Sequence, residues 1–256
     1  MFLGKELFSK TIGCVLLLMA TTGSCSTKKN IQGTILSASG TIFCDGLIRG
    51  TGLHIDKSTR NHSIIITAAH VLYDDSSEKL FEKCSYRPNN MRLQAVSFAE
   101  LSKHGYSPHD RNKIKQSETD IVFVALTRKL HQPVFHLSEK PPNFEDVRSS
   151  EGLRVIAYDS IKNQIEISAE CGFVKGTSFS SNLLIFHNCP TGPGSSGGPL
   201  IVSNQLKFVG IHGGTLLIRK ENLTSEKTEN ISRLRQGRII DEYVLAVFEQ
   251  FRSGLL

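Results

Sequence analysis

Short apolar runs recur along most of the chain, and polar or glycine-rich stretches separate them. The runs are rich in Val, Ile and Phe: Gly40–Phe43, Gly52–Ile55, Ser63–Thr67, Asp120–Leu126, Leu153–Tyr158, Gln164–Ala169, Asn182–Phe186, Pro199–Val202 and Lys207–Ile211. Runs of this length and composition, broken by Gly, Asn, Asp and Ser, predict β-strands. They do not alternate regularly with helical segments, so the pattern predicts an all-β barrel or sandwich rather than a parallel sheet.

The end of the chain has a different periodicity. Within Arg238–Phe251, apolar residues recur at helical spacing: Ile239, Ile240, Tyr243, Val244, Val247, Phe248 and Phe251. This spacing predicts one amphipathic helix packed on the core. The polar segment Arg219–Gln236 before it is expected to be an exposed loop. Prolines among polar residues near Gln132–Val147 indicate a connector, which divides the chain into halves at 31–135 and 145–256.

The N-terminus has the pattern of an export signal. Lys5 and Lys10 precede the apolar run Thr11–Ala20, and small residues follow, so residues 1–25 are predicted to be a signal peptide. The run is shorter than the ~20 apolar residues of a membrane-spanning helix, and no other run approaches that length. The protein is therefore expected to be secreted or periplasmic without a membrane span. Cys25 lies in a sequence that resembles a bacterial lipoprotein site, which leaves a lipid anchor at Cys25 as an alternative.

Four cysteines remain after the signal: Cys44, Cys84, Cys171 and Cys189. An even number in an exported chain favours disulfides, and three connectivities are open. Pairing within each half, Cys44–Cys84 and Cys171–Cys189, is the expected one because it gives each half its own crosslink. Zinc binding is the rival interpretation, but no C-x-x-C spacing supports it.

Composition changes this picture little. The chain has 39% hydrophobic and 21% charged residues, with a formal net charge of +6, as in ordinary globular proteins. The Lys and Arg residues are mostly dispersed, and no zinc-finger, P-loop or RNA-binding pattern is present, so a solvated surface is favoured over nucleic-acid binding. We expect a monomer without a metal or other cofactor.

Three segments carry residues that could do chemistry. In Thr191–Leu200 (TGPGSSGGPL), glycines and prolines surround two serines, which suits a tight turn whose amides hold an oxyanion beside an exposed hydroxyl. A serine hydroxyl needs a base to act as a nucleophile. In Ser63–Leu72 (SIIITAAHVL), an apolar strand ends in two small residues and then His70, and these small side chains leave space around its ring. Asp120 begins an apolar run, where a partly buried carboxylate needs a partner such as protonated imidazole.

Together these segments resemble the trypsin and chymotrypsin family, through TAAH, an Asp before an apolar strand, and G-x-S-G-G-P-L in the order His, Asp, Ser. The resemblance spans roughly Gly40 to Gly214 and is closest to bacterial trypsin-like and glutamyl endopeptidase-like members. It implies two six-stranded antiparallel β-barrels, chymotrypsin-like, with a C-terminal α-helix. The first barrel would carry His70 and Asp120, and the second would carry Ser196. The implied activity is that of a secreted serine endopeptidase acting on polypeptides through an acyl-enzyme.

The resemblance also implies a role for each residue. His70 would take the proton from Ser196 and give it to the leaving amine, while Asp120 would orient His70. The N–H groups of Gly194 and Ser196 would form the oxyanion hole. Ser196 is favoured over Ser195 because it directly precedes Gly-Gly-Pro. Ser195 stands where digestive members have an ion-pairing Asp, so activation by that ion pair is not expected.

The specificity pocket follows from the same resemblance. Thr191 would line it, and His212, Gly213 and Gly214 would flank it at the end of a strand. Glutamyl endopeptidases resemble this combination of a hydroxyl and a His, so Glu or Asp before the scissile bond is a candidate preference. The alternative is a His that merely lines a shallow pocket.

Two other functions are compatible with parts of the sequence. Gly194–Gly198 fits the G-x-S-x-G elbow of α/β-hydrolases, but that fold needs a helix after the Ser and the base downstream. Here Pro199 follows, and His212 is the only later histidine. A catalytically silent binding protein on a protease fold is the second alternative, although all three members of the expected triad are present.

Overall fold

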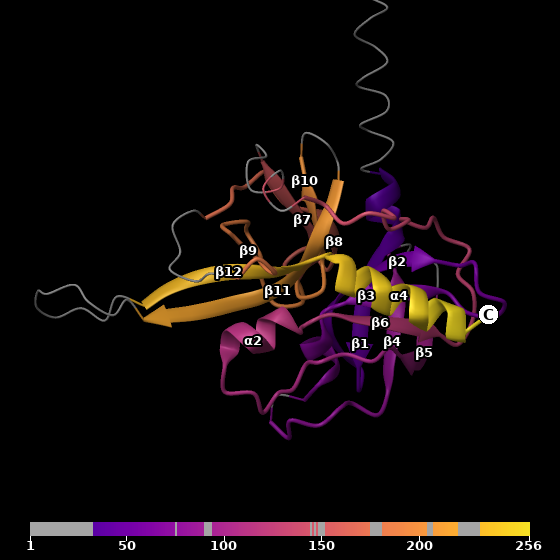
Figure 1. The fold of residues 1–256 in the computed structure, drawn as a ribbon. Coiled ribbons are helices and arrows are strands. Elements are labelled where there is room, and N and C mark those ends of the chain that lie inside the picture. Colours follow the sequence, from indigo (N-terminus) through magenta and orange to yellow (C-terminus); the bar gives the residue numbers. More distant parts are fainter. Residues whose placement is uncertain are drawn as a thin grey trace, which may run out of the picture.

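The computed structural model describes two β-sheets and a C-terminal helix (Figure 1). The described residues are 33–74, 76–89, 94–143, 145, 147, 152–174, 181–203, 207–219 and 231–256. The predicted signal peptide and Cys25 lie outside these residues. In the described part of the chain, no helix is long and apolar enough to cross a membrane.

The first sheet is a closed antiparallel barrel with the strand order β1-β2-β3-β6-β5-β4. Its strands are β1 (Ser39–Cys44), β2 (Leu47–Asp56), β3 (Ile64–Thr67), β4 (Cys84–Pro88), β5 (Val96–Leu101) and β6 (Val122–Leu126). All residues of β3 and β6 are buried, because the interior of the barrel covers one face and other elements cover the opposite face. This explains why both strands are continuous apolar runs instead of alternating ones.

The second sheet is also antiparallel and six-stranded, with the order β8-β7-β10-β11-β12-β9. Its strands are β7 (Leu153–Asp159), β8 (Gln164–Ile167), β9 (Leu184–His187), β10 (Pro199–Val202), β11 (Lys207–Arg219) and β12 (Ile231–Ile239). Isolated bridges join Leu153 to Cys171 and Phe173 to His187, so the segment after β8 reaches both β7 and β9. The all-β prediction with a C-terminal helix is confirmed.

The C-terminal helix α4 runs over Glu242–Gly254. Asp241 caps it, because its side chain accepts a hydrogen bond from the Val244 backbone N–H. Val244 and Phe248 are buried, and the Phe248 ring lies 5.2 Å from that of Phe123 in β6. Helix α4 therefore packs against β6 of the barrel, although it begins four residues later than its predicted start at Arg238.

The expected exposed loop at Arg219–Gln236 is partly wrong. Strand β12 begins at Ile231 and pairs with β11 along nine residue positions, from Arg219–Ile231 to Gly210–Ile239. The two strands form a long ribbon that projects from the rest of the second sheet (Figure 1). Hydrogen bonds to the backbone of β11 stabilise this strand. Its many polar side chains are typical of loops, so a prediction from composition did not identify it as a strand.

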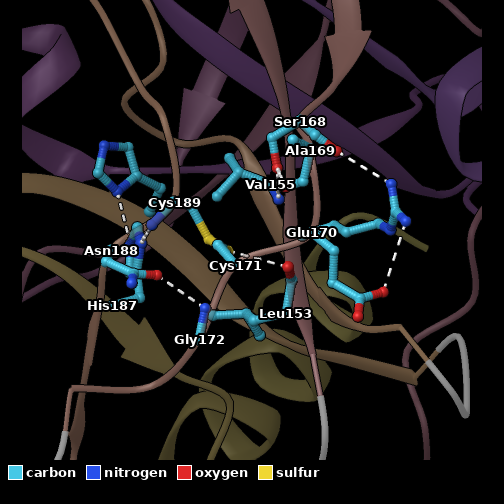
Figure 2. Close-up of a disulfide and its surroundings, with 12 residues drawn as sticks. Leu153, Val155, Ser168, Ala169, Glu170, Cys171, Gly172, His187, Asn188 and Cys189 are labelled. Atoms are coloured by element: carbon cyan, nitrogen blue, oxygen red, sulfur yellow. Dashed lines mark hydrogen bonds and ion pairs between the residues drawn. A yellow bond between two sulfur atoms is a disulfide. The ribbon is translucent and has the colours of Figure 1, made fainter.

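Both expected disulfides are present. Cys44 and Cys84 are direct partners where β1 pairs with β4. Cys171 and Cys189 join the segment after β8 to the segment after β9, and Figure 2 shows this bond together with Leu153, Asn188 and His187, the last residue of β9. The Gly172 N–H also donates to Asn188 Oδ1 across the same junction. The crosslink thus fixes the chain two residues before Thr191, where the serine turn begins.

Candidate active site

The His70 side chain is held by Asp120 through two contacts. His70 lies in the 3₁₀ turn η1 (Ala69–Leu72) directly after β3, and Asp120 lies just before β6, the neighbour of β3 in the barrel. One Asp120 oxygen is 2.7 Å from His70 Nδ1, and the other accepts the His70 backbone N–H at 2.8 Å. Asp120 is only 3% exposed. Because a carboxylate only accepts, it places the Nδ1 proton toward Asp120 and leaves Nε2 of the neutral ring as a base.

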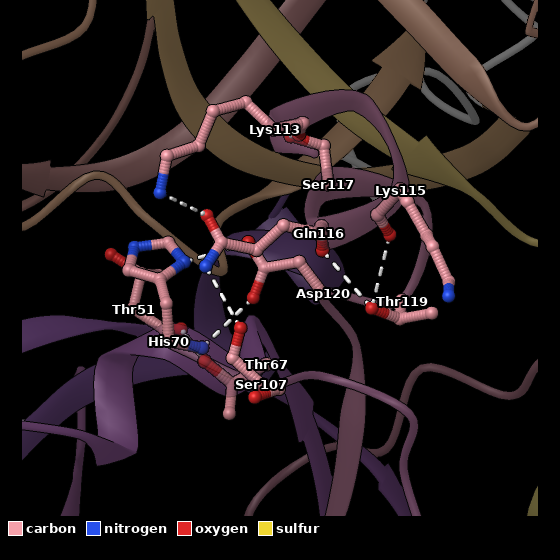
Figure 3. A network of polar contacts seen from close by, with 10 residues as sticks. All are labelled: Thr51, Thr67, His70, Ser107, Lys113, Lys115, Gln116, Ser117, Thr119 and Asp120. Carbon is pink, nitrogen blue, oxygen red and sulfur yellow. Dashed lines mark hydrogen bonds and ion pairs between the residues drawn. The ribbon is translucent and has the colours of Figure 1, made fainter. Parts of the chain in front are cut away.

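Helix α2 (Lys113–Glu118) and the loop before it form a wall of the cleft beside His70 and Asp120 (Figure 3). The helix begins at Asn112, whose side chain accepts the N–H groups of Ile114 and Lys115. Gln116 donates to the carbonyl oxygens of Ser107 and Pro108, which ties the helix to the preceding loop. The cleft, of about 290 Å³, separates this wall from β11, with His70 and Asp120 among its lining residues.

The serine turn is bonded to both sheets. Thr51 of β2 donates its backbone N–H to the Ser196 carbonyl at 2.7 Å and its hydroxyl to the Gly194 carbonyl at 2.8 Å. On the other side, the Gly197 N–H donates to the His212 carbonyl at 2.7 Å, and the His212 N–H donates to the Gly198 carbonyl at 2.8 Å. The turn that carries Ser196 therefore occupies the junction between the barrel and the second sheet.

This junction brings the serine turn next to the residues that precede His70. A Cβ atom built on Gly197 would lie 3.0 Å from the Ala68 nitrogen, two residues before His70 in the chain. Gly194 and Gly197 have φ values of 85° and 82°, in the left-handed region that glycine adopts without strain. The backbone conformation of the turn therefore explains why glycine occupies positions 194 and 197 of the motif.

The two serines of the motif have different surroundings. Ser195 is buried, and its hydroxyl accepts the Gly192 N–H at 3.1 Å and lies 3.5 Å from the Tyr158 carbonyl. Ser196 is partly exposed. Among the described residues, no carbonyl or side chain accepts a hydrogen bond from the N–H of Gly194 or Ser196. Unpaired backbone donors are uncommon in folded proteins, and these two flank a hydroxyl.

The four residues expected at the specificity pocket fall in different surroundings. His212 is 3% exposed and lies against the serine turn. Gly213 lines the cleft that contains His70, and Gly214 follows it at a bulge of β11. Thr191 lines another cavity, of about 490 Å³, together with Tyr158. The structure thus places His212 at the serine turn and Gly213 at the cleft that contains His70. Thr191 lines a different cavity, and neither His212 nor Gly213 is among the described residues that line it.

Sequence reasoning missed two residues in this region. His187 Nε2 lies 3.1 Å from His212 Nδ1, and Arg235 is the register partner of His187 on β12. Burial and then the charge of Arg235 lower the pKa of His187 to about 3. Burial, followed by the charges of neighbouring groups, holds the pKa of His212 well below its usual value. A histidine directly after the predicted apolar run Asn182–Phe186 was the available signal in the sequence.

The close packing of Gly197 leads to a first prediction. A Cβ atom there would lie 2.2 Å from both the Thr51 carbonyl and Thr67 Oγ1. Positive φ costs a residue with a side chain roughly 1–2 kcal/mol, and overpacking adds about 1–3 kcal/mol. Gly197→Ala should therefore lower the free energy of unfolding by at least about 2 kcal/mol, measured by urea denaturation, and should reduce kcat/KM at least about tenfold by displacing Ser196.

Gly192 is the matched control for this substitution. It belongs to the same turn, but a Cβ atom added at Gly192 would meet no other atom within 4 Å. Gly192→Ala should leave the unfolding midpoint and kcat/KM close to those of the unmodified protein. Equal behaviour of the two variants would show that the serine turn is not packed against Thr51.

Comparison with known proteins defines the family. A family model described as the trypsin-like peptidase domain matches residues 50–211, so the chain belongs to the trypsin-like peptidase family. No curated protein sequence matches the chain.

Solved structures show the same fold at low sequence identity. A Glu endopeptidase in complex with MPD has a TM-score of 0.57 and 15% identity, over 85% of this chain and 91% of that one. Kallikrein-related peptidase 10 has a TM-score of 0.57 and 13% identity, over 86% and 98%. The protease Anisep from Arthrobacter nicotinovorans has a TM-score of 0.58 and 12% identity, over 86% and 97%. The family and the fold together support a serine peptidase acting on peptides.

Proposed function

We propose that the protein is a serine endopeptidase in which Ser196 is the nucleophile, His70 the general base and Asp120 the residue that orients His70. The observation that carries this proposal is the double contact of Asp120 with His70, at 2.7 and 2.8 Å. It fixes the ring and its tautomer beside a serine turn that is bonded to both sheets. The α/β-hydrolase alternative fails, because β10, not a helix, follows the serine.

The proposed reaction has two stages. In the first, His70 Nε2 takes the proton of the Ser196 hydroxyl as Oγ attacks the scissile carbonyl, and the resulting imidazolium is stabilised by Asp120. The oxyanion accepts hydrogen bonds from the N–H groups of Gly194 and Ser196. His70 then protonates the leaving amine and leaves an acyl-enzyme. In the second stage, His70 takes a proton from a water molecule that attacks the ester carbonyl. His70 then returns the proton to Ser196 Oγ, and the acid product is released.

A fluorophosphonate probe tests the nucleophile. The probe should label the protein once, and peptide mass mapping should place the label on Ser196 and not on the buried Ser195. Pre-treatment that modifies His70 should slow the labelling. If the folded protein is not labelled, the catalytically silent binding protein becomes the better description. A label on another residue would overturn the assignment of Ser196.

We also propose a preference for Glu or Asp before the scissile bond. The proximity of His212 to the serine turn supports it, as does the structural neighbour that is a Glu endopeptidase. Digestion of a peptide library tests the preference, because acidic residues should be enriched before the cleaved bonds. Equal cleavage after acidic and neutral residues would overturn it.

Export from the cytoplasm is the third part of the proposal. Two disulfides support it, because such bonds persist in oxidising compartments. The mass of the mature protein from an exporting host distinguishes a secreted form cleaved near residue 25 from a form that carries lipid on Cys25. A full-length protein retained in the cytoplasm would contradict both forms.

A further inference from the structure

Three strands of the second sheet place two histidines and one arginine on the same face, next to the serine turn. Arg235 of β12 lies opposite His187 of β9, and Gly237 of β12 lies opposite His212 of β11. Residues directly opposite on antiparallel strands project from the same face, as do residues two apart on one strand. The side chains of His187, His212 and Arg235 therefore share one face, and the contact between the two rings agrees with this.

Protein groups occupy three of the four nitrogens of these two imidazoles. The Cys189 backbone N–H donates to His187 Nδ1 at 3.3 Å, so the proton of the neutral His187 ring is on Nε2. His187 Nε2 then donates to His212 Nδ1 at 3.1 Å, which leaves the His212 proton on its own Nε2. The backbone of Gln236 raises the pKa of His212 against the larger, opposing effect of burial, so this backbone also lies near the ring.

Both histidines are also uncharged near neutral pH. Burial lowers the pKa of His187 to about 3 and that of His212 well below its usual value. The positive charge of Arg235 also lowers the pKa of each of them, in agreement with the shared face given by the strand register. Any positive charge at this place on the face therefore comes from Arg235.

Arg235 has no counter-charge among the described residues. Its side chain is partly buried, and within the described ranges it forms no ion pair and no hydrogen bond with another side chain or with the backbone. Its other cross-strand neighbour, Thr215, lines the cleft that contains His70. A guanidinium that loses hydration without gaining a partner is unfavourable, whereas two parallel N–H groups match a carboxylate well. This arrangement suits an anionic ligand.

We propose that Arg235 is the specificity-determining residue of this peptidase, the cation that binds the carboxylate of a Glu or Asp side chain directly before the scissile bond. This inference rests on the proposed function, and it changes the role of His212. In this proposal, the two buried, neutral histidine rings pack beside Arg235. Arg235 supplies the positive charge that binds the carboxylate.

Matched peptide substrates test this proposal. One fluorogenic sequence is prepared with Glu, Gln, Ala or Lys before the scissile bond, and kcat/KM is measured for the full chain and for Arg235→Gln. Removing one partner of a desolvated charge pair typically costs a factor of about 10² or more. The ratio of Glu to Gln cleavage should fall by about 10²-fold in Arg235→Gln, while cleavage of the Gln peptide stays within about threefold.

Two further variants control for charge and folding. Arg87→Gln makes the same change at an arginine that stacks on Phe43 in the first barrel, and it should leave the Glu to Gln ratio unchanged. Arg235→Lys keeps the charge but loses the paired N–H groups, so its ratio should fall between those of the unmodified protein and Arg235→Gln. If Arg235→Gln does not unfold cooperatively, Arg235→Met takes its place because it also removes the charge, and an unchanged ratio in that variant overturns the proposal.

A binding measurement separates this inference from the proposed activity. Fluorescence anisotropy is recorded for the Glu and Gln peptides with Ser196→Ala, with and without Arg235→Gln. One outcome is that the Glu peptide binds more tightly than the Gln peptide, that this difference depends on Arg235, and that the unmodified protein hydrolyses neither peptide. This outcome would support the anion site and overturn the proposed peptidase activity. Hydrolysis without any preference for Glu, or a preference that survives Arg235→Gln, would overturn the role of Arg235 and leave the peptidase standing.

Discussion

Replacing Ser196 by Ala is expected to lower kcat for peptide hydrolysis by about 10⁶-fold and to abolish fluorophosphonate labelling. The methyl side chain of Ala cannot form an acyl-enzyme. The remaining hydrolysis would then proceed by direct attack of water on the scissile carbonyl. Binding should persist, because the N–H groups and the cleft are unchanged. Initial rates on a fluorogenic peptide, measured at saturating substrate, test the change in kcat.

Ser195→Ala is the matched control, since it makes the same change one residue earlier. The Ser195 hydroxyl accepts the Gly192 N–H inside the turn, so its loss should affect the position of the turn and not the chemistry. We expect a reduction in kcat of about tenfold or less, in keeping with the loss of one hydrogen bond. If the Ser195 variant were inactive and the Ser196 variant active, the nucleophile would be Ser195.

The second large effect is expected for Asp120→Asn, which should lower kcat by about 10⁴-fold with little change in KM. The Asp120 carboxylate accepts both the His70 ring proton and the His70 backbone N–H. The two contacts use different oxygens of Asp120, and Asn keeps an accepting oxygen at only one of these two positions, so in the same pose it can keep only one of the contacts. If its NH₂ group faces the ring, it stabilises the tautomer with the proton on Nε2, and that tautomer cannot act as the base toward Ser196.

Two observations distinguish this effect from general damage. Labelling of Ser196 in the Asn variant should be slowed by a similar factor, and raising the pH should restore only part of the rate. Asp110→Asn is the control in the same connecting segment, because Asp110 Oδ1 accepts the Asn112 N–H and, within the described ranges, makes no contact with His70. A loss of less than about tenfold in Asp120→Asn would mean that His70 is oriented by another group.

The sequence was sufficient to predict the parts of the molecule that depend on local pattern. The apolar runs at Ser63–Thr67 and Asp120–Leu126 correspond to β3 and β6, which are buried throughout. Their adjacency in the barrel could be inferred only through the family resemblance, since fifty residues separate His70 from Asp120 in the chain. The disulfide pairs followed from an even number of cysteines and from the division into halves.

Features that depend on the partner strand were not predictable in this way. Strand β12 contains Ser232, Arg233, Arg235 and Gln236, a composition typical of loops, and β11 supplies the hydrogen bonds that make it a strand. The association of Arg235 with His187 is a consequence of register between β12 and β9. Register is fixed by the three-dimensional arrangement and leaves no trace in the spacing of the two residues.

The contacts of Thr51 with the serine turn also bear on when the protein becomes harmful to its own cell. Thr51 belongs to the first barrel, whereas the carbonyl groups of Gly194 and Ser196 that it binds belong to the second half of the chain. An unfinished or unfolded polypeptide lacks this contact, so the proposed base His70 and the proposed nucleophile Ser196 stay apart. On the proposed function, peptide hydrolysis would then require both halves to be folded against each other, so a chain that is exported unfolded would be inactive in the cytoplasm.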